Sequence, residues 1–225
     1  MANKKIDQDA LRQENIESTV TKAERIYNDN KKSIWTAAGV AAVIILAVIG
    51  YSEFIAKPKA AEAMAQMFPA ENSFAEGEFD LALNGDGNTL GFNDIIDQYG
   101  ARGGKDIYFY AGVCNLRLEQ YDEAIAMLKK YKGKDNVLAA RAESCIGDAY
   151  TGLENYEEAL KHFLKAAAKV DNVYAATYYL RAGITCEELE RKDEALKYYR
   201  IIKDKYSDSI EGYEIDKYIT RAEAE

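Results

Sequence analysis

The chain of 225 residues contains 29 basic and 38 acidic side chains and a single histidine, which gives a formal net charge of −9. Its 48% hydrophobic and 30% charged residues are typical of a globular protein with one or two domains. Because an excess of carboxylates repels a phosphate backbone, we expect no nucleic acid among its partners.

Residues 1–32 form a polar N-terminal segment with 7 basic and 6 acidic side chains. Its few apolar and small residues recur at nearly helical spacing, as Ile6, Ala10, Ile16, Val20, Ala23 and Tyr27. The spacing fits a helix that docks on a cytosolic partner, and the polarity fits a flexible tail equally well. Both interpretations of residues 1–32 stay open at this point.

Residues 33–52 contain no charged side chain, and Trp35 and Tyr51 stand near the two ends of this run. A helix of about 20 residues spans roughly 30 Å, the thickness of the hydrocarbon core of a bilayer, and aromatic side chains prefer its interfaces. A core helix would be amphipathic, and a cleaved signal peptide would not follow so long a polar segment. We therefore expect a transmembrane helix at 33–52 that stays in the mature protein.

Positive charges flank the apolar run unevenly, with Lys22, Arg25, Lys31 and Lys32 before it and Lys57 and Lys59 after it. Because basic residues accumulate on the cytoplasmic side of a membrane, this bias places residues 1–32 in the cytoplasm. Residues 53–225 are then expected to form a periplasmic domain of an inner-membrane protein. This domain has 22 basic and 32 acidic side chains, a net charge of −10.

A spaced pattern recurs three times after residue 100. Its glycines, at 112, 147 and 183, lie 35 and 36 residues apart, and alanines at 124, 159 and 195 repeat the same intervals. Bulky residues recur at fixed distances from these glycines and alanines, namely Tyr108, Leu118, Tyr121, Leu128, Tyr150, Leu153, Tyr156, Phe163, Tyr179, Leu189 and Tyr199. Small side chains let paired helices approach to about 8–10 Å, so the pattern predicts stacked helix pairs.

This pattern resembles the tetratricopeptide repeat, whose period is about 34 residues. The resemblance implies an all-α fold, a right-handed α-solenoid with repeats at about 105–138, 140–173 and 176–209, preceded by the transmembrane helix. Residues 60–99, interrupted by a loop at 84–91, are interpreted as a degenerate repeat of the same domain. Asp208 and Glu211 resemble a capping box, which predicts a capping helix at 209–223 over the last repeat.

No residue pattern points to catalysis, to a metal or to a cofactor. His162 is the only histidine, and its position in the repeat usually faces solvent. No nucleophile elbow, phosphate loop or histidine-based metal motif occurs in the sequence. The loop 84–91 begins as a calcium loop does, but Thr89 and Ile95 take the places of the glycine and the terminal glutamate, so we expect a plain turn.

The three cysteines, Cys114, Cys145 and Cys186, take neighbouring positions in the repeat pattern on the first helix of each pair. A small apolar side chain packs well at such positions, so we expect buried thiols. A disulfide across adjacent repeats stays the alternative for a domain outside the cytoplasm.

The remaining candidate surface is the concave groove that the first helices of such repeats line. The resemblance assigns to it Asp106, Phe109, Val113, Leu116, Arg117, Arg141, Ser144, Asp148, Thr151, Thr177, Leu180, Ile184, Glu187 and Glu188. This set lacks the Lys and Asn residues with which repeats of this kind clamp a C-terminal carboxylate. We expect an extended peptide or a partner helix as ligand, and the alternative is that Phe109, Val113, Leu180 and Ile184 belong to the core.

The order of polar tail, apolar span and acidic repeat domain resembles the YfgM-type proteins, which are ancillary subunits of the bacterial Sec translocon and work with periplasmic chaperones. The resemblance implies a non-catalytic interaction scaffold anchored in the inner membrane. The alternative is a structural adaptor in envelope or cell-wall assembly, because an anchor with such repeats serves many functions.

Overall fold

The computed structural model of the protein describes residues 2–224, with side chains at 24, 27–100, 102 and 104–224. Every regular element within residues 2–224 is a helix. The chain divides into two units, Met1–Pro58 and Lys59–Glu225.

The first unit consists of a long helix, α1 (Ala2–Tyr51), which a π-helix (Ser52–Ala56) follows. Helix α1 contains both the polar segment and the apolar run, so the structure makes residues 2–32 helical. Its apolar side chains are exposed, as Val43 at 66% and Leu46 at 67% show. Among the described residues, one helical stretch is long and apolar enough to cross a membrane, and it contains this run.

Helix α2 (Lys57–Glu76) crosses the boundary between the units, and α3 (Phe79–Asn84), α4 (Phe92–Tyr99) and a 3-10 turn (Gly100–Gly103) follow it. Helices α2, α3 and α4 cover the degenerate repeat expected at 60–99. An aromatic cluster centred on Phe74 joins these helices to the first repeat. The centroid of the Phe74 ring lies 5.8 Å from that of Phe79 and 5.1 Å from that of Tyr110, and both pairs are edge-to-face. Aromatic pairs in this geometry stabilise a fold beyond their buried area.

The loop between α3 and α4 is held by hydrogen bonds to the side chain of Asp86. The Asp86 Oδ1 atom accepts hydrogen bonds from the N–H groups of Asn88 and Thr89, at 2.9 and 2.7 Å. A Cβ atom at Gly91 would lie 2.4 Å from the Leu83 carbonyl oxygen, so only glycine fits where the loop closes.

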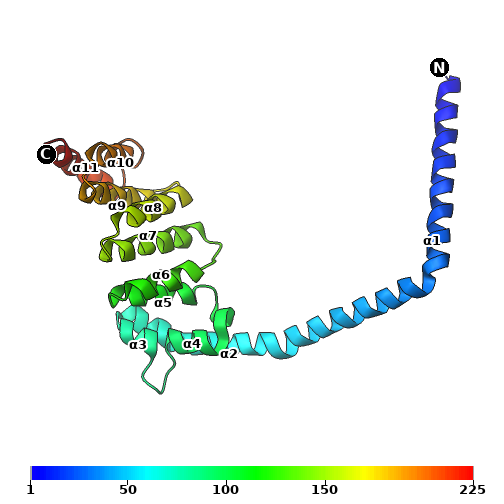
Figure 1. Cartoon of the computed structure of the whole chain (residues 1–225), viewed down its shortest axis with the longest axis horizontal. Coiled ribbons are helices and arrows are strands. Elements are labelled where there is room, and N and C mark those ends of the chain that lie inside the picture. The colour runs from blue at the N-terminus through cyan, green and yellow to red at the C-terminus, as the bar shows by residue number, and fades with distance from the viewer. Residues whose placement is uncertain (1, 225) are drawn as a thin grey trace. The chain divides into compact units, whose positions relative to one another are not determined.

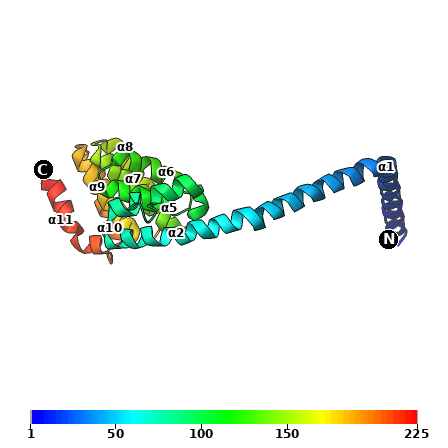
Figure 2. The same ribbon diagram turned by 90° about the horizontal axis from the view of Figure 1, so that it is seen from below.

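Three helix pairs follow and stack in chain order (Figure 1), and Figure 2 shows them from below. The pairs are α5 (Ile107–Arg117) with α6 (Tyr121–Lys130), α7 (Asn136–Gly152) with α8 (Tyr156–Lys169), and α9 (Tyr174–Glu188) with α10 (Lys192–Lys205). Helix α11 (Ile210–Ala224) packs against α10 and α9. This arrangement is the α-solenoid that the repeat pattern predicts.

The predicted boundaries between repeats lie too far along the chain. Helix α7 already begins at Asn136, because the Asp135 Oδ1 atom accepts the N–H of Leu138 at 2.7 Å and caps the helix. Helix α9 begins at Tyr174, whose N–H donates to Asn172 Oδ1 at 3.0 Å. Short polar side chains in the connecting turns therefore set the helix starts.

Each pair is held by one glycine on its first helix and one bulky side chain on its second. A Cβ atom added to the glycine would meet that side chain at 2.5 Å for Gly112 and Leu128, 2.6 Å for Gly147 and Phe163, and 2.2 Å for Gly183 and Tyr199. The three bulky side chains are at most 2% exposed. The equivalent surroundings of the glycines confirm the predicted packing. The bulky partners fill the space within their own pair.

The cap of α11 differs from the predicted capping box. Ser209 takes the capping position, since its Oγ accepts the N–H of Gly212 at 2.9 Å. Glu211, the predicted reciprocal partner of Asp208, instead accepts a hydrogen bond at 2.5 Å from the Thr177 hydroxyl of α9. The capping helix thus begins one residue later than predicted and is tied to the last repeat by a side chain.

The turns inside the three pairs share a left-handed glutamate, at Glu119, Glu154 and Glu190, with φ of 60°, 57° and 59°. In each turn the next N–H donates back to a carbonyl of the first helix, as Asn155 does to Tyr150 at 2.8 Å. This is the Schellman geometry, in which glycine is preferred at the left-handed position. A side chain there costs stability in every pair.

We predict that Glu154→Gly raises the free energy of unfolding by up to about 1 kcal/mol, because glycine adopts the left-handed conformation without a steric penalty. Chemical denaturation of the full chain measures this change. Glu157→Gly is the matched control, since Glu157 is in the first turn of α8 and glycine there is destabilising by about 0.5–1 kcal/mol. Equal losses of stability in the two variants would contradict the role of the turn.

Candidate partner-binding groove

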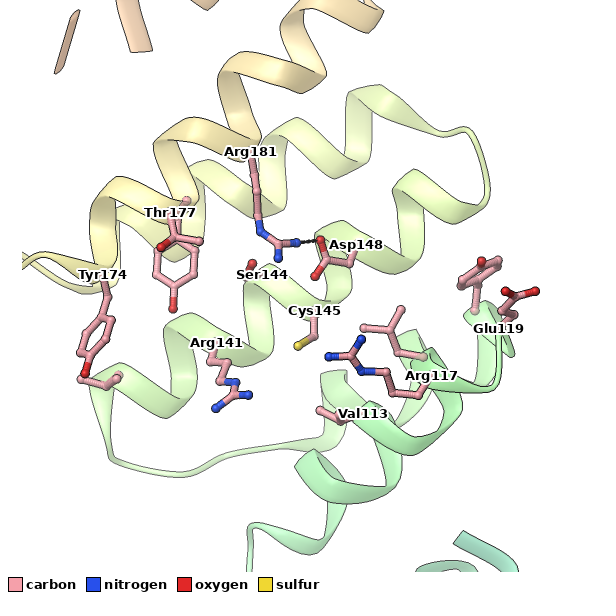
Figure 3. Close-up of a pocket in the computed structure, with 14 residues that line it drawn as sticks. Val113, Arg117, Glu119, Arg141, Ser144, Cys145, Asp148, Tyr174, Thr177 and Arg181 are labelled. Carbon is pink, nitrogen blue, oxygen red and sulfur yellow. Dashed lines mark hydrogen bonds and ion pairs between the residues drawn. The ribbon is translucent and has the colours of Figure 1, made fainter. Parts of the chain in front are cut away.

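A groove with a volume of about 810 Å³ runs across the first helices of the three pairs (Figure 3). Its walls come from α5, α7 and α9, together with the turn after α5 and the start of α6. The lining residues are Val113, Leu116, Arg117, Glu119, Tyr121, Val137, Arg141, Ser144, Cys145, Asp148, Tyr174, Thr177, Tyr178 and Arg181. We refer to this surface as the groove.

Half of the residues assigned to the groove from the sequence line it in the structure. These are Val113, Leu116, Arg117, Arg141, Ser144, Asp148 and Thr177. They come from all three first helices, α5, α7 and α9.

The other assigned residues lie outside the lining, namely Asp106, Phe109, Thr151, Leu180, Ile184, Glu187 and Glu188. Phe109 is 4% exposed and its ring packs 6.0 Å from that of Tyr131, so it belongs to the core between helices. Leu180 packs against the core of the third pair. Glu187 forms an ion pair with Arg221 of α11, because the terminal helix covers this side of α9.

The sequence did not identify seven lining residues, which are Glu119, Tyr121, Val137, Cys145, Tyr174, Tyr178 and Arg181. Val137 and Tyr174 stand in the first turns of α7 and α9, ahead of the predicted repeat starts. Two polar side chains in the sequence signal these earlier helix starts: Asp135, which caps α7, and Asn172, whose Oδ1 accepts the N–H of Tyr174.

Three arginines face the groove, and their environments differ. The Arg181 guanidinium donates to the Asp148 carboxylate and forms an ion pair with it. The guanidinium carbons of Arg117 and Arg141 lie 6.0 Å and 5.9 Å from the ring centroids of Phe79 and Phe109. Within the part of the chain whose side chains are described, neither of these two arginines forms an ion pair.

The Cys145 sulfur lies on the groove wall among these arginines (Figure 3). Partial burial raises the pKa of its thiol, and the charges of Arg141, Arg181 and Arg117 act in the opposite direction. The other two cysteines are buried, and burial raises the pKa of Cys114 to about 12 and that of Cys186 to about 11. All three are free thiols; Cys114 and Cys186 are buried as predicted, whereas Cys145 is only partly buried.

His162 is buried, whereas its position in the repeat predicted a solvent-facing side chain. It is 6% exposed, its ring stacks on Tyr150 with centroids 5.5 Å apart, and Nδ1 lies 2.8 Å from Glu143 Oε2. It lies at a second cleft, of about 420 Å³, whose lining includes Lys129, Lys132, Lys165 and Lys169. The imidazole is buried because two side chains of α7 contact it, the ring of Tyr150 and the carboxylate of Glu143.

The polar groups that line the groove and the cleft beside His162 are suited to binding a ligand. Among the described residues, no group of three or more His, Cys, Asp or Glu side chains is placed to hold a metal ion. The buried histidine has a carboxylate neighbour, Glu143, and its ring faces the aromatic Tyr150. The groove offers guanidinium, hydroxyl and carboxylate groups beside apolar side chains, which is the chemistry of a peptide-binding surface.

The pKa of His162 provides a test of its burial. Burial lowers this pKa, and the hydrogen bond to Glu143 only partly offsets the effect. The contribution of His162 to stability is therefore present above the pKa of the unfolded chain and is lost as the pH falls through the lower folded pKa. We predict that Glu143→Gln lowers the pKa further, because the carboxylate that favours the charged imidazole is gone.

NMR titration measures this pKa directly, since the chain has one histidine and hence one imidazole signal. The control is Glu157→Gln, which removes an exposed carboxylate of α8, the helix that carries His162. This variant should leave the histidine titration unchanged. An ordinary or raised histidine pKa in the wild-type chain would show that His162 is not buried as described.

Comparison with known proteins agrees with the helix-pair architecture. Models of the tetratricopeptide repeat family match residues 106–135 and 138–200. The crystal structure of MamA protein is similar to this chain with a TM-score of 0.57 and 18% identity, over 73% of this chain and 84% of that chain. No curated protein sequence matches the chain. The stacked pairs and the two family matches together show that the chain carries tetratricopeptide repeats.

Proposed function

We propose that the protein is a non-catalytic interaction scaffold that binds an extended segment of a partner protein in the groove. One observation carries this proposal, namely that three successive first helices contribute side chains to a single continuous surface. Tetratricopeptide repeats generally bind proteins or peptides, and a segment laid across several repeats contacts each of them in turn.

The composition of the groove supports a peptide ligand. Apolar side chains remain accessible along it, as the 40% and 55% exposure of Val137 and Tyr174 shows. Between them stand hydroxyl and guanidinium groups that can orient a backbone or a polar side chain. A surface with apolar contacts and a few directed polar groups gives both affinity and register to an extended segment.

We also propose that α1 anchors the scaffold in the inner membrane. The exposed apolar side chains between Ile34 and Ile49 support this, because so long an apolar face is unfavourable in water and favourable in lipid. The uneven positive charges around the span favour a cytoplasmic N terminus and a periplasmic solenoid.

The partner that we propose is the Sec translocon, together with the chaperones or secretory chains around it. The order of polar tail, span and acidic repeat domain supports it through the resemblance to YfgM-type proteins. A membrane anchor keeps the protein on the membrane, which raises its effective concentration for chains that emerge there.

Site-specific photocrosslinking in cells tests this proposal. We predict that a photoreactive residue at Leu116, Val137 or Tyr174, all in the groove, captures translocon subunits, periplasmic chaperones or secretory chains. The controls are Lys192 and Lys197, which are exposed on α10 outside the groove and should capture these proteins much less often. A C-terminal alkaline phosphatase fusion in the same cells should be active if the solenoid is periplasmic.

Equal capture from groove and control positions would contradict the groove as the binding surface. Capture of envelope or cell-wall assembly proteins in place of translocon components would favour the structural adaptor. An inactive phosphatase fusion would reverse the proposed orientation of the span.

A further inference from the structure

The groove contains an excess of hydrogen-bond donors for which the chain supplies no acceptor. The guanidiniums of Arg117 and Arg141 form no ion pair among the described side chains. Ser144 and Tyr178 also line the groove, and no described group forms a hydrogen bond with their hydroxyls. The groove is therefore rich in donors that face its open surface, and a ligand with acceptor oxygens can pair with them.

The carboxylates near the groove leave these donors free. Asp148 forms an ion pair with Arg181, and Glu211 accepts a hydrogen bond from the hydroxyl of Thr177. Glu119 stands at the edge of the groove and its carboxylate points away from the Arg117 guanidinium, which points inward below Cys145 (Figure 3). The groove is therefore locally cationic within a domain whose net charge is −10.

The two unpaired arginines are held in place before any ligand arrives. Each guanidinium lies about 6 Å from an aromatic centroid, Arg117 at Phe79 and Arg141 at Phe109. A planar guanidinium that already rests against a ring loses less freedom on binding than a mobile lysine does. Burial is the main cause that lowers the pKa of Arg181, and the positive charge of Arg117 lowers it further.

We infer that the groove selects an extended, acidic segment of a partner protein, in which carboxylate side chains are interspersed with apolar ones. Carboxylates pair with Arg117 and Arg141, oxygens of the segment accept from Ser144 and Tyr178, and apolar side chains pack on Val137 and Tyr174. This inference rests on the proposed function, because it names the chemistry of the segment that the groove binds.

Fluorescence anisotropy with the full chain in lipid nanodiscs tests the inference. The probe is a fluorescein-labelled peptide of about ten residues, which spans roughly 33 Å when extended, with glutamates interspersed among valines and tyrosines. We predict that it binds at least about tenfold more tightly than the same peptide with glutamine at every glutamate position, since each guanidinium–carboxylate contact is charge-assisted. Because the groove is open to solvent, added salt should weaken binding of the glutamate peptide.

Arg117→Gln combined with Arg141→Gln should weaken binding of the glutamate peptide by about tenfold or more. Arg200→Gln is the matched control, since it removes an arginine of α10 that pairs with Glu223 outside the groove, and it should change affinity by less than about twofold. Thermal unfolding of both variants verifies that the solenoid still folds.

The outcomes separate this inference from the proposed function. Equal affinity for the glutamate and glutamine peptides would overturn the selectivity for acidic segments and leave the groove as a binding surface. Failure of both peptides to bind, while groove crosslinkers still capture partners, would also overturn the inference alone. Failure of both the peptides and the crosslinkers would overturn the proposed function as well.

Discussion

The structure of the repeat domain depends on the contact between a glycine of each first helix and a bulky side chain sixteen residues later. Because Gly147 has no side chain, the buried ring of Phe163 fills the space beside it. A buried bulky side chain fills the same space beside the glycine in the other two pairs. Because the helices of a pair come this close, their remaining apolar faces are free to bury against the next pair. Repetition of one local contact therefore builds a stack with a continuous core.

The same contact determines what the groove presents. Since the glycine side of each first helix faces its partner helix, another side of α5, α7 and α9 is left to line a shared surface. Helices that are fixed in this way hold Arg117 and Arg141 against aromatic rings and place Ser144 in the wall of the groove. Recognition in this protein would then come from a preformed surface, with little rearrangement needed to admit a segment.

The period of small and bulky residues was sufficient to predict the helix pairs, their stacking and the face of the first helices that lines the groove. The helix starts that periodicity predicts are too late, because the true starts depend on single polar side chains such as Asp135 and Asn172. Groove residues such as Tyr174 were missed for the same reason. The burial of His162 also escaped prediction, since it depends on Glu143 and Tyr150 of the preceding helix, whose contacts with the imidazole no spacing within α8 encodes.

A double-mutant cycle between Gly147 and Phe163 tests the glycine contact most directly, with the free energy of unfolding as the measured quantity. Alanine at Gly147 would place a methyl group 2.6 Å from the Phe163 ring, so Gly147→Ala should destabilise the wild-type chain despite the better helix propensity of alanine. In the Phe163→Ala background the clash is gone, and the same substitution should stabilise the chain by up to about 1 kcal/mol. An identical effect of Gly147→Ala in both backgrounds would show that the two residues do not meet, and would contradict the packing on which the solenoid and its groove are built.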